Sequence, residues 1–258
     1  MTGSFSLMLF STDADWIALN VAAGVSAIIV DWERNGKDVR QSGADTQIGT
    51  DTIEDLERVR AATTARVICR INGYCEATRC EVDQAIGAGA DEILLPMVGS
   101  ASEVARTIDH ARGRCGVGVL IETLEAVENA ESIAALPITR AYLGLNDLAI
   151  ARRAPSIFAA LVDGTLAAVR PCFDVPFGFG GLTLPEKGSP VPCRLLMSLM
   201  AGNRSTFSFL RRSYNRDITG RDPRIEVPRI LAAIESARRR SEGDMARDVQ
   251  ELAGMLAA

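Results

Sequence analysis

Short apolar runs alternate with longer amphipathic stretches along most of the chain. Eight of these runs predict β-strands. Most of them are apolar at nearly every position, which is typical of parallel strands covered on both faces. They span residues 7–10, 27–31, 66–71, 92–96, 116–121, 140–145, 176–179 and 206–210.

The stretches between these runs predict α-helices. Thr52 with Asp55, and Ser100 with Glu103, each fit a capping residue followed three positions later by an acid, which favours a helix start. The expected helices span residues 14–23, 52–62, 78–88, 101–111, 124–136, 155–169 and 193–201, with a last helix near 228–240 and a tail over 244–256.

Eight strand–helix units favour a closed (β/α)8 TIM barrel over a doubly wound sheet. No Gly-x-Gly-x-x-Gly motif follows the first strand, which weakens a dinucleotide-binding interpretation. No linker divides the chain, so residues 1–258 are expected to form one domain. The helical segment 221–258 could pack on a neighbouring subunit. The polar stretch 36–49 is expected to be a loop at the C-terminal rim after strand two.

The composition limits the classes of function. The chain has 28 basic and 33 acidic residues, so it lacks the positive charge that nucleic-acid binding requires. Its six cysteines include no Cys-x-x-Cys pair, which fits a reduced intracellular protein. The sequence shows no signal peptide and no apolar run long enough to span a membrane. We therefore expect a cytoplasmic protein that binds neither nucleic acid nor membranes.

Charged and polar residues follow most of the predicted strands. In a (β/α)8 barrel the chemistry lies at the C-terminal ends of the strands, so these residues converge on one mouth. A single acid after a strand is commonplace because turns favour it, but acids or arginines after five strands favour a functional site. The candidate site residues are Asp31, Glu33, Arg34, Arg70, Glu122, Asn146, Asp147, Gly180, Gly181 and Arg212.

The ordered motifs VDWER, CRIN, EILLPMVGS, LIETLEAVENAESIAA, YLGLNDLAI and FGFGGL resemble the HpcH/HpaI aldolase and citrate-lyase β-subunit family. The resemblance covers residues 27–215 and implies a pyruvate-type barrel enzyme that depends on a divalent metal. By this resemblance, Glu122 and Asp147 bind Mg²⁺, Mn²⁺ or Co²⁺, and Arg70 contacts an oxygen of pyruvate or its enolate. It also implies that backbone N–H groups around Asn146 hold the substrate carboxylate.

Elementary chemistry agrees with the implied metal site. Two carboxylates leave most positions of a hard cation open for water and for the oxygens of a 2-oxo acid. The bound cation would act as a Lewis acid on the developing enolate, and Arg70 would add a second positive charge. In the alternative interpretation, Glu122 is a buried ion-pair partner of Arg70, and Asp147 is the N-cap of the next helix.

Other candidates have two interpretations each. Asp31 and Glu33 lie two apart, hence on one face of an extended strand, where they could relay protons or orient water, or bond only the following loop. Gly180 and Gly181 could bind phosphate or form a tight turn. Arg212 could contact an anionic end of the substrate.

One position departs from the resemblance. The pyruvate aldolases of the family have a histidine for the acid–base step directly after the strand-two glutamate, where this chain has Arg34. His110, the single histidine, is expected on an outer helix. An arginine is no general base near neutral pH, so metal-bound hydroxide, Asp31 or Glu33 are the candidates, and Arg34 could select an anionic acceptor.

The leading hypothesis is a carbon–carbon lyase or aldolase that acts through the enolate of pyruvate or a related 2-oxo acid. The expected partners are this acid, an aldehyde or a CoA thioester, and further copies of the chain in a trimer or hexamer. The alternatives are an acyl-CoA lyase of citrate-lyase or malyl-CoA type, a phosphoenolpyruvate-type barrel, and a non-catalytic barrel.

Overall fold

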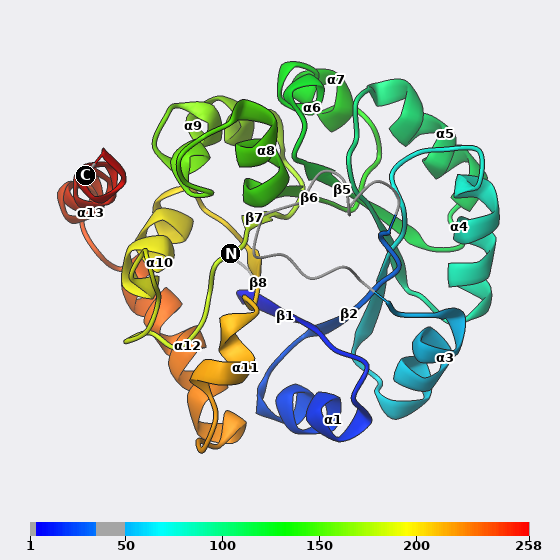
Figure 1. Cartoon of the computed structure of the whole chain (residues 1–258), viewed down its shortest axis with the longest axis horizontal. Coiled ribbons are helices and arrows are strands. Elements are labelled where there is room, and N and C mark those ends of the chain that lie inside the picture. The colour runs from blue at the N-terminus through cyan, green and yellow to red at the C-terminus, as the bar shows by residue number, and fades with distance from the viewer. Residues whose placement is uncertain (1–3, 35–49, 258) are drawn as a thin grey trace.

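Eight parallel strands pair in chain order and close into a barrel, because β1 is hydrogen-bonded to both β2 and β8 (Figure 1). The computed structural model describes residues 4–34 and 50–257. The strands are β1 (Ser6–Phe10), β2 (Ala27–Asp31), β3 (Arg66–Arg70), β4 (Glu92–Leu95), β5 (Gly116–Ile121), β6 (Arg140–Leu143), β7 (Phe177–Phe179) and β8 (Phe207–Phe209). The expected (β/α)8 barrel is confirmed.

Helices surround the strands on the outside of the barrel (Figure 1). They are α1 (Ala14–Ala23), α3 (Ile53–Ala62), α4 (Thr78–Gly87), α5 (Ala101–Ala111), α6 (Leu124–Glu128), α7 (Ala130–Ala134), α8 (Leu145–Arg152), α9 (Thr165–Val169), α10 (Cys193–Gly202), α11 (Ser213–Asp217), α12 (Pro223–Arg238) and α13 (Glu242–Ala257), with 3-10 turns η1 (Ala159–Leu161) and η2 (Arg170–Cys172).

Local sequence signals set several helix starts. Thr52 with Asp55, and Ser100 with Glu103, form the two expected capping boxes, in which side chains satisfy backbone N–H groups that a helix start leaves unpaired. The helix α5 carries His110, whose Nε2 lies 3.0 Å from Asp83 of α4. His110 is therefore on the outer ring of helices, as predicted.

Two helix predictions are wrong in the second half of the chain. The segment 124–136 contains two short helices, α6 and α7, which meet at Asn129. The predicted helix 155–169 is mostly absent, since the helix after β6 is α8, which starts directly at Leu145. Gly144 stands at its N-cap and Arg153, in the left-handed conformation, ends it. The apolar residues of this short helix continue those of the strand, so periodicity alone did not separate them.

Strand pairing fixes the neighbours at the C-terminal mouth of the barrel. The β2–β3 register places Asp31 opposite Arg70. The β5–β6 register places Ile121 opposite Leu143, so that Glu122 and Gly144 follow at the same level. The predicted loop 36–49 lies outside the described residues.

The opposite, N-terminal end of the barrel is closed by a buried ion pair. Glu92 on β4 accepts from Arg140 on β6 through both carboxylate oxygens, at 2.6 and 2.7 Å, and also from Thr139 at 2.7 Å. Both charged residues are at most 9% exposed. A Cβ at Gly118 would lie 2.7 Å from Arg140 and 2.9 Å from Glu92, so a residue without a side chain makes room for the pair.

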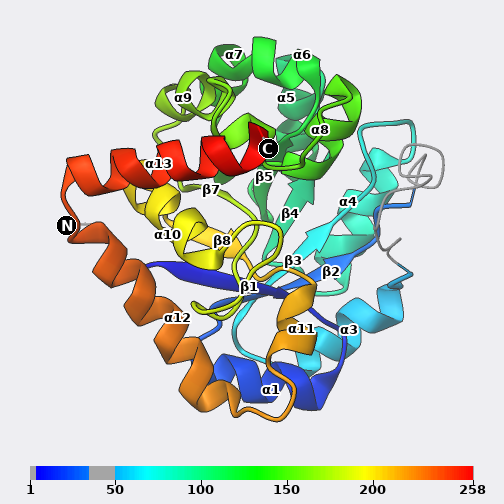
Figure 2. The ribbon, with the colours of Figure 1, turned by 60° about the vertical axis from the view of Figure 1, so that its left-hand side comes forward.

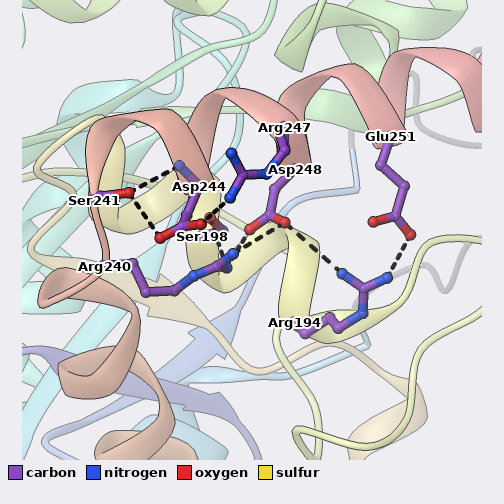
Figure 3. Close-up of polar contacts among 8 residues, drawn as sticks. All are labelled: Arg194, Ser198, Arg240, Ser241, Asp244, Arg247, Asp248 and Glu251. Atoms are coloured by element: carbon purple, nitrogen blue, oxygen red, sulfur yellow. Dashed lines mark hydrogen bonds and ion pairs between the residues drawn. The ribbon is translucent and has the colours of Figure 1, made fainter.

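The C-terminal helix α13 lies outside the ring of helices, beside α10 (Figures 1 and 2). Its Leu252 is buried. Figure 3 shows Asp248 of α13 between Arg240 and Arg194, which hold the helix against α10. The helix thus packs on its own barrel, and a contact of segment 221–258 with a neighbouring subunit stays a prediction. None of the helices within residues 4–34 and 50–257 has the length and apolarity needed to cross a membrane.

We expect the ion pair between Glu92 and Arg140 to be a major determinant of stability. Breaking a buried pair strands a charge in a low-dielectric interior and costs about 3–5 kcal/mol. Urea unfolding of Glu92→Gln and of Arg140→Met should show losses of this order, and the double variant Glu92→Leu/Arg140→Met should lose less than their sum. Arg247→Ala, which removes an exposed pair on α13, should change stability little. Equal effects in the buried and exposed variants would contradict this role.

Candidate active site

A clamped arginine forms one side of the C-terminal mouth. Arg70 Nε and Nη2 donate to the two carboxylate oxygens of Asp31 at 2.8 and 2.7 Å, and Nη1 lies 3.4 Å from Glu33. Asp31 and Glu33 therefore face the same residue, as their spacing along the chain predicted. These contacts leave one further hydrogen on each terminal nitrogen of the guanidinium for another acceptor.

The surroundings keep Arg70 charged and fixed in place. Burial alone would lower its pKa, but Asp31, and then Glu33 and Glu122, raise the pKa above its ordinary value. The face of the Phe10 ring lies 5.1 Å from the guanidinium carbon, within the range of a cation–π contact. Arg70 is thus a rigid positive group at the mouth.

The second side of the mouth holds a buried carboxylate. Glu122 is only 3% exposed, and its Oε1 accepts from the Met97 backbone N–H at 3.0 Å. Burial, then the charges of Glu33 and Asp147, raise the pKa of Glu122 to about 8, and Arg70 offsets part of this effect. Arg70 forms its ion pairs with Asp31 and Glu33, so the structure gives no support to Glu122 as its ion-pair partner.

A glycine makes the space for Glu122. A Cβ at Gly144, on the neighbouring strand end, would lie 2.3 Å from Glu122 Oε2 and 2.5 Å from its Cβ. The helix α8 begins at once, which places Asp147 in its first turn. The alternative interpretation of Asp147 as the N-cap is wrong, because Gly144 occupies that position. Asn146 precedes it in the same turn and is half-buried, as is Asp147.

The donor set at Glu122 and Asp147 fits a hard divalent cation. Carboxylate oxygens are the preferred ligands of such ions, and a positive ion would offset the mutual repulsion that raises the pKa of Glu122. Within the described residues, no group of three or more His, Cys, Asp or Glu side chains is arranged to hold a metal. A cation held by these two carboxylates alone would keep positions open for a substrate.

A polar network supports the end of β2 from the side. The Arg34 backbone N–H donates to Asn72 Oδ1 at 2.8 Å, and Glu81 of α4 accepts from both the backbone and the side chain of Asn72. The Arg34 side chain donates to the Asp51 carbonyl at 2.7 Å. These residues line an open hollow of about 320 Å³ together with Trp32. Sequence reasoning missed Glu81, whose helix position gave no signal.

The remaining candidates lie at the ends of β7 and β8. A Cβ at Gly180 would lie 2.2 Å from the Tyr142 hydroxyl oxygen, so this glycine makes room for a side chain of β6. Gly181 has a φ of +124°, a backbone conformation that few residues other than glycine adopt. Arg212 is exposed and is the N-cap residue of α11. A role of these three residues in binding an anion stays a prediction.

A sequence model of the HpcH/HpaI aldolase/citrate lyase family matches residues 7–156. The chain belongs to this family. The matched region runs from β1 to just past α8, and it contains Asp31, Glu33, Arg70, Glu122 and Asp147. The resemblance seen in the motifs is therefore confirmed, and membership points to lyase chemistry of the aldolase and citrate-lyase type.

Solved structures of other proteins share the fold of this family member. An HpcH/HpaI aldolase from Desulfitobacterium hafniense DCB-2 aligns with a TM-score of 0.64 at 14% identity, over 93% of this chain and 95% of that one. RipC from Yersinia pestis aligns with a TM-score of 0.60 at 14% identity, over 95% and 100%. No protein of curated function matches the chain significantly in sequence.

The raised pKa of Glu122 predicts how this family member responds to pH without metal. Since the pKa lies above the ordinary value of 4.5, the folded state binds the proton more tightly than the unfolded state does. Its contribution to stability is therefore complete below about pH 4.5 and is lost as the pH rises through about 8. Thermal unfolding in a chelator should show a larger fall between these pH values for the wild type than for Glu122→Gln.

Glu57→Gln is the matched control, because Glu57 is exposed on α3. It should leave the pH dependence of the melting temperature unchanged. If Glu122→Gln and the wild type lose stability in parallel, Glu122 is not held protonated by its surroundings.

Proposed function

We propose that this chain is a divalent-metal-dependent carbon–carbon lyase that acts through the enolate of pyruvate or a related 2-oxo acid. The observation that carries the proposal is that the same mouth contains the clamped guanidinium of Arg70 and the buried carboxylate of Glu122. Further carboxylates lie near Glu122. Arg70 supplies a positive charge, and a cation beside Glu122 would offset the effects that raise the pKa of this carboxylate. An enolate, which has adjacent carboxylate and enolate oxygens, would be bound by Arg70 and by a cation held at Glu122.

Glu122 and Asp147 would hold the metal, with Mg²⁺, Mn²⁺ or Co²⁺ suited to their oxygen ligands. When bound, the metal supplies a Lewis acid that stabilises negative charge on the oxygen of the 2-oxo group. Asp147 is half-buried, so this part of the mouth would be accessible to a small acid.

The protein itself supplies the rest of the charge stabilisation. The hydrogens that remain on Arg70 would donate to the same oxygen, at a fixed orientation because Asp31 grips the other side of the guanidinium. By the family resemblance, the backbone N–H groups around Asn146, in the first turn of α8, would bind the substrate carboxylate.

The proton that leaves the substrate needs an acceptor other than histidine, because His110 lies on the outer helix α5. Asp31 is engaged by Arg70 through two short hydrogen bonds. Glu33, whose carboxylate lies 3.4 Å from Arg70 Nη1, is the other candidate base. Arg34, beside the hollow at the mouth, would select an anionic acceptor aldehyde. A cytoplasmic homo-oligomer, trimer or hexamer, remains our expectation.

The first test follows deuterium exchange at the methyl group of pyruvate in the presence of Mn²⁺ or Mg²⁺. We expect exchange with the wild type, and none after Glu122→Ala or Asp147→Ala, because a site with so few protein ligands loses most of its affinity with either carboxylate. Calorimetry should show the loss of Mn²⁺ binding in both variants, and circular dichroism an unchanged fold.

His110→Gln is the control for this assay, and it should exchange at the wild-type rate. Metal binding that survives in both carboxylate variants would refute the ligand assignment. A wild type that binds metal but exchanges no deuterium would refute the enolate mechanism and favour the phosphoenolpyruvate-type or non-catalytic alternatives.

The role of Arg70 can be tested by a substitution that keeps the charge. We expect Arg70→Lys to lower the exchange rate at saturating pyruvate by about 100-fold or more, because an ammonium cannot contact Asp31 and the substrate oxygen in one plane. Arg66→Lys is the control, since Arg66 contacts Glu92 at the opposite end of the barrel. A nearly normal rate in Arg70→Lys would assign Arg70 a structural role only.

A further inference from the structure

The hydroxyl of Tyr142, at the floor of the mouth, takes part in none of the hydrogen bonds and ion pairs described above. Tyr142 is the second-last residue of β6 and points into the barrel, where it belongs to the inner cluster with Leu120 and Phe209. It is 9% exposed. Its ring stacks on the ring of Phe209 at a centroid distance of 4.0 Å and an angle of 13°. The ring therefore has one fixed orientation.

The hydroxyl of Tyr142 reaches the level of the site. A Cβ on Gly180, at the end of β7, would lie 2.2 Å from the hydroxyl oxygen but 3.5 Å from the ring carbon that carries it. The β5–β6 register pairs Tyr142 with the inward-facing Leu120, two residues before Glu122, so the ring lies one inward position below Glu122. Among the described residues, no protein group accepts a hydrogen bond from it.

This situation differs from that of the other deeply buried tyrosine. Tyr214 of α11 is fully buried, and its hydroxyl donates to Asn20 of α1 at 2.7 Å. The hydroxyl of Tyr214 is thus accounted for by the fold. That of Tyr142 is not, and its position points to an acceptor that the protein does not supply.

We propose that the Tyr142 hydroxyl donates a hydrogen bond to an oxygen of the bound 2-oxo acid and contributes to the stabilisation of its enolate. The inference rests on the proposed function, and it adds a neutral donor to the positive charge of Arg70. Because Tyr142 stands at the floor, beneath Glu122, it faces the acid held deepest in the mouth rather than an acceptor that enters later.

The protonation state of Tyr142 suits this role. Burial, and then the charge of Glu122, raise its pKa above the ordinary value, with a smaller opposing effect of Arg70. The hydroxyl is therefore a neutral donor over the whole working pH range. A donor fixed by stacking needs no reorganisation as charge develops, which is the condition under which such hydrogen bonds contribute most to a rate.

The test compares Tyr142→Phe with Tyr214→Phe in the Mn²⁺-dependent deuterium exchange of pyruvate. We expect Tyr142→Phe to lower the exchange rate at saturating pyruvate by about 10- to 100-fold, the usual effect of losing one hydrogen bond to a charged group. Its Mn²⁺ affinity and melting temperature should stay at the wild-type values. Tyr214→Phe should show the reverse: a lower melting temperature and an unchanged rate.

A second pair of variants tests the position of the hydroxyl. Gly180→Ala should lower the melting temperature of the wild type, because the new methyl group collides with the hydroxyl oxygen. In the Tyr142→Phe background the same substitution should be tolerated, since the nearest ring carbon is at an ordinary contact distance. An equal loss in both backgrounds would place the hydroxyl elsewhere and overturn the proposal.

The outcomes separate this inference from the proposed function. If the wild type exchanges deuterium and Tyr142→Phe does so within about twofold of its rate, the hydroxyl does not contact the substrate, and the function stands without it. If the wild type itself shows no exchange although it binds Mn²⁺, the enolate mechanism fails, and the inference about Tyr142 fails with it.

Discussion

A closed ring of eight parallel strands leaves little space along its axis, and the inward-pointing side chains must share it. This constraint shapes both ends of the barrel. At the N-terminal end, Gly118 leaves room for Glu92 and Arg140. At the C-terminal end, Gly144 leaves room for Glu122, and Gly180 for the hydroxyl of Tyr142. Glycines therefore set where polar groups can enter an interior that is otherwise filled by apolar side chains.

The two ends use charge in opposite ways. Glu92 is matched by Arg140 and receives further contacts from Thr139 and Arg66, so its charge is neutralised by the fold. Such a pair holds the strands in place and has no remaining capacity to bind a ligand. At the mouth, Arg70 is matched by Asp31, while Glu122 is buried near further carboxylates, and burial and then their charges raise its pKa. An arrangement that is unfavourable in isolation is typical of a binding site for a cation.

The match to the HpcH/HpaI aldolase/citrate lyase family ends shortly after α8, and the residues that carry the proposed chemistry lie on the ends of β2, β3, β5 and β6 within it. The later strands contribute the stacking partner Phe209 and the open position at Gly180. The last two strands, β7 and β8, thus shape the floor of the mouth, and the ends of earlier strands supply its charges. Substrate selection by Arg34 or Arg212 would be added at the rim.

The sequence by itself determined the order of strands and helices, because buried parallel strands require apolar runs and their ends require polar residues. Most strands were predicted to within one or two residues. The motifs marked Arg70, Glu122 and Asp147 as candidate site residues. The helix α8 was missed, since its apolar residues directly continue those of β6. A short apolar helix cannot be told from the end of a strand by periodicity alone.

Only the tertiary structure decided which charges meet. Arg70 could have paired with Glu122, but the β2–β3 register gives it Asp31, which lies 39 positions away along the chain. Glu92 and Arg140 are separated by 48 positions, and nothing local marks them as partners. The position of the Tyr142 hydroxyl at the mouth could not be predicted from the sequence either, because a tyrosine in an apolar strand is typically a core residue. Whether its hydroxyl finds a partner depends on side chains from other strands, and these meet only when the barrel closes.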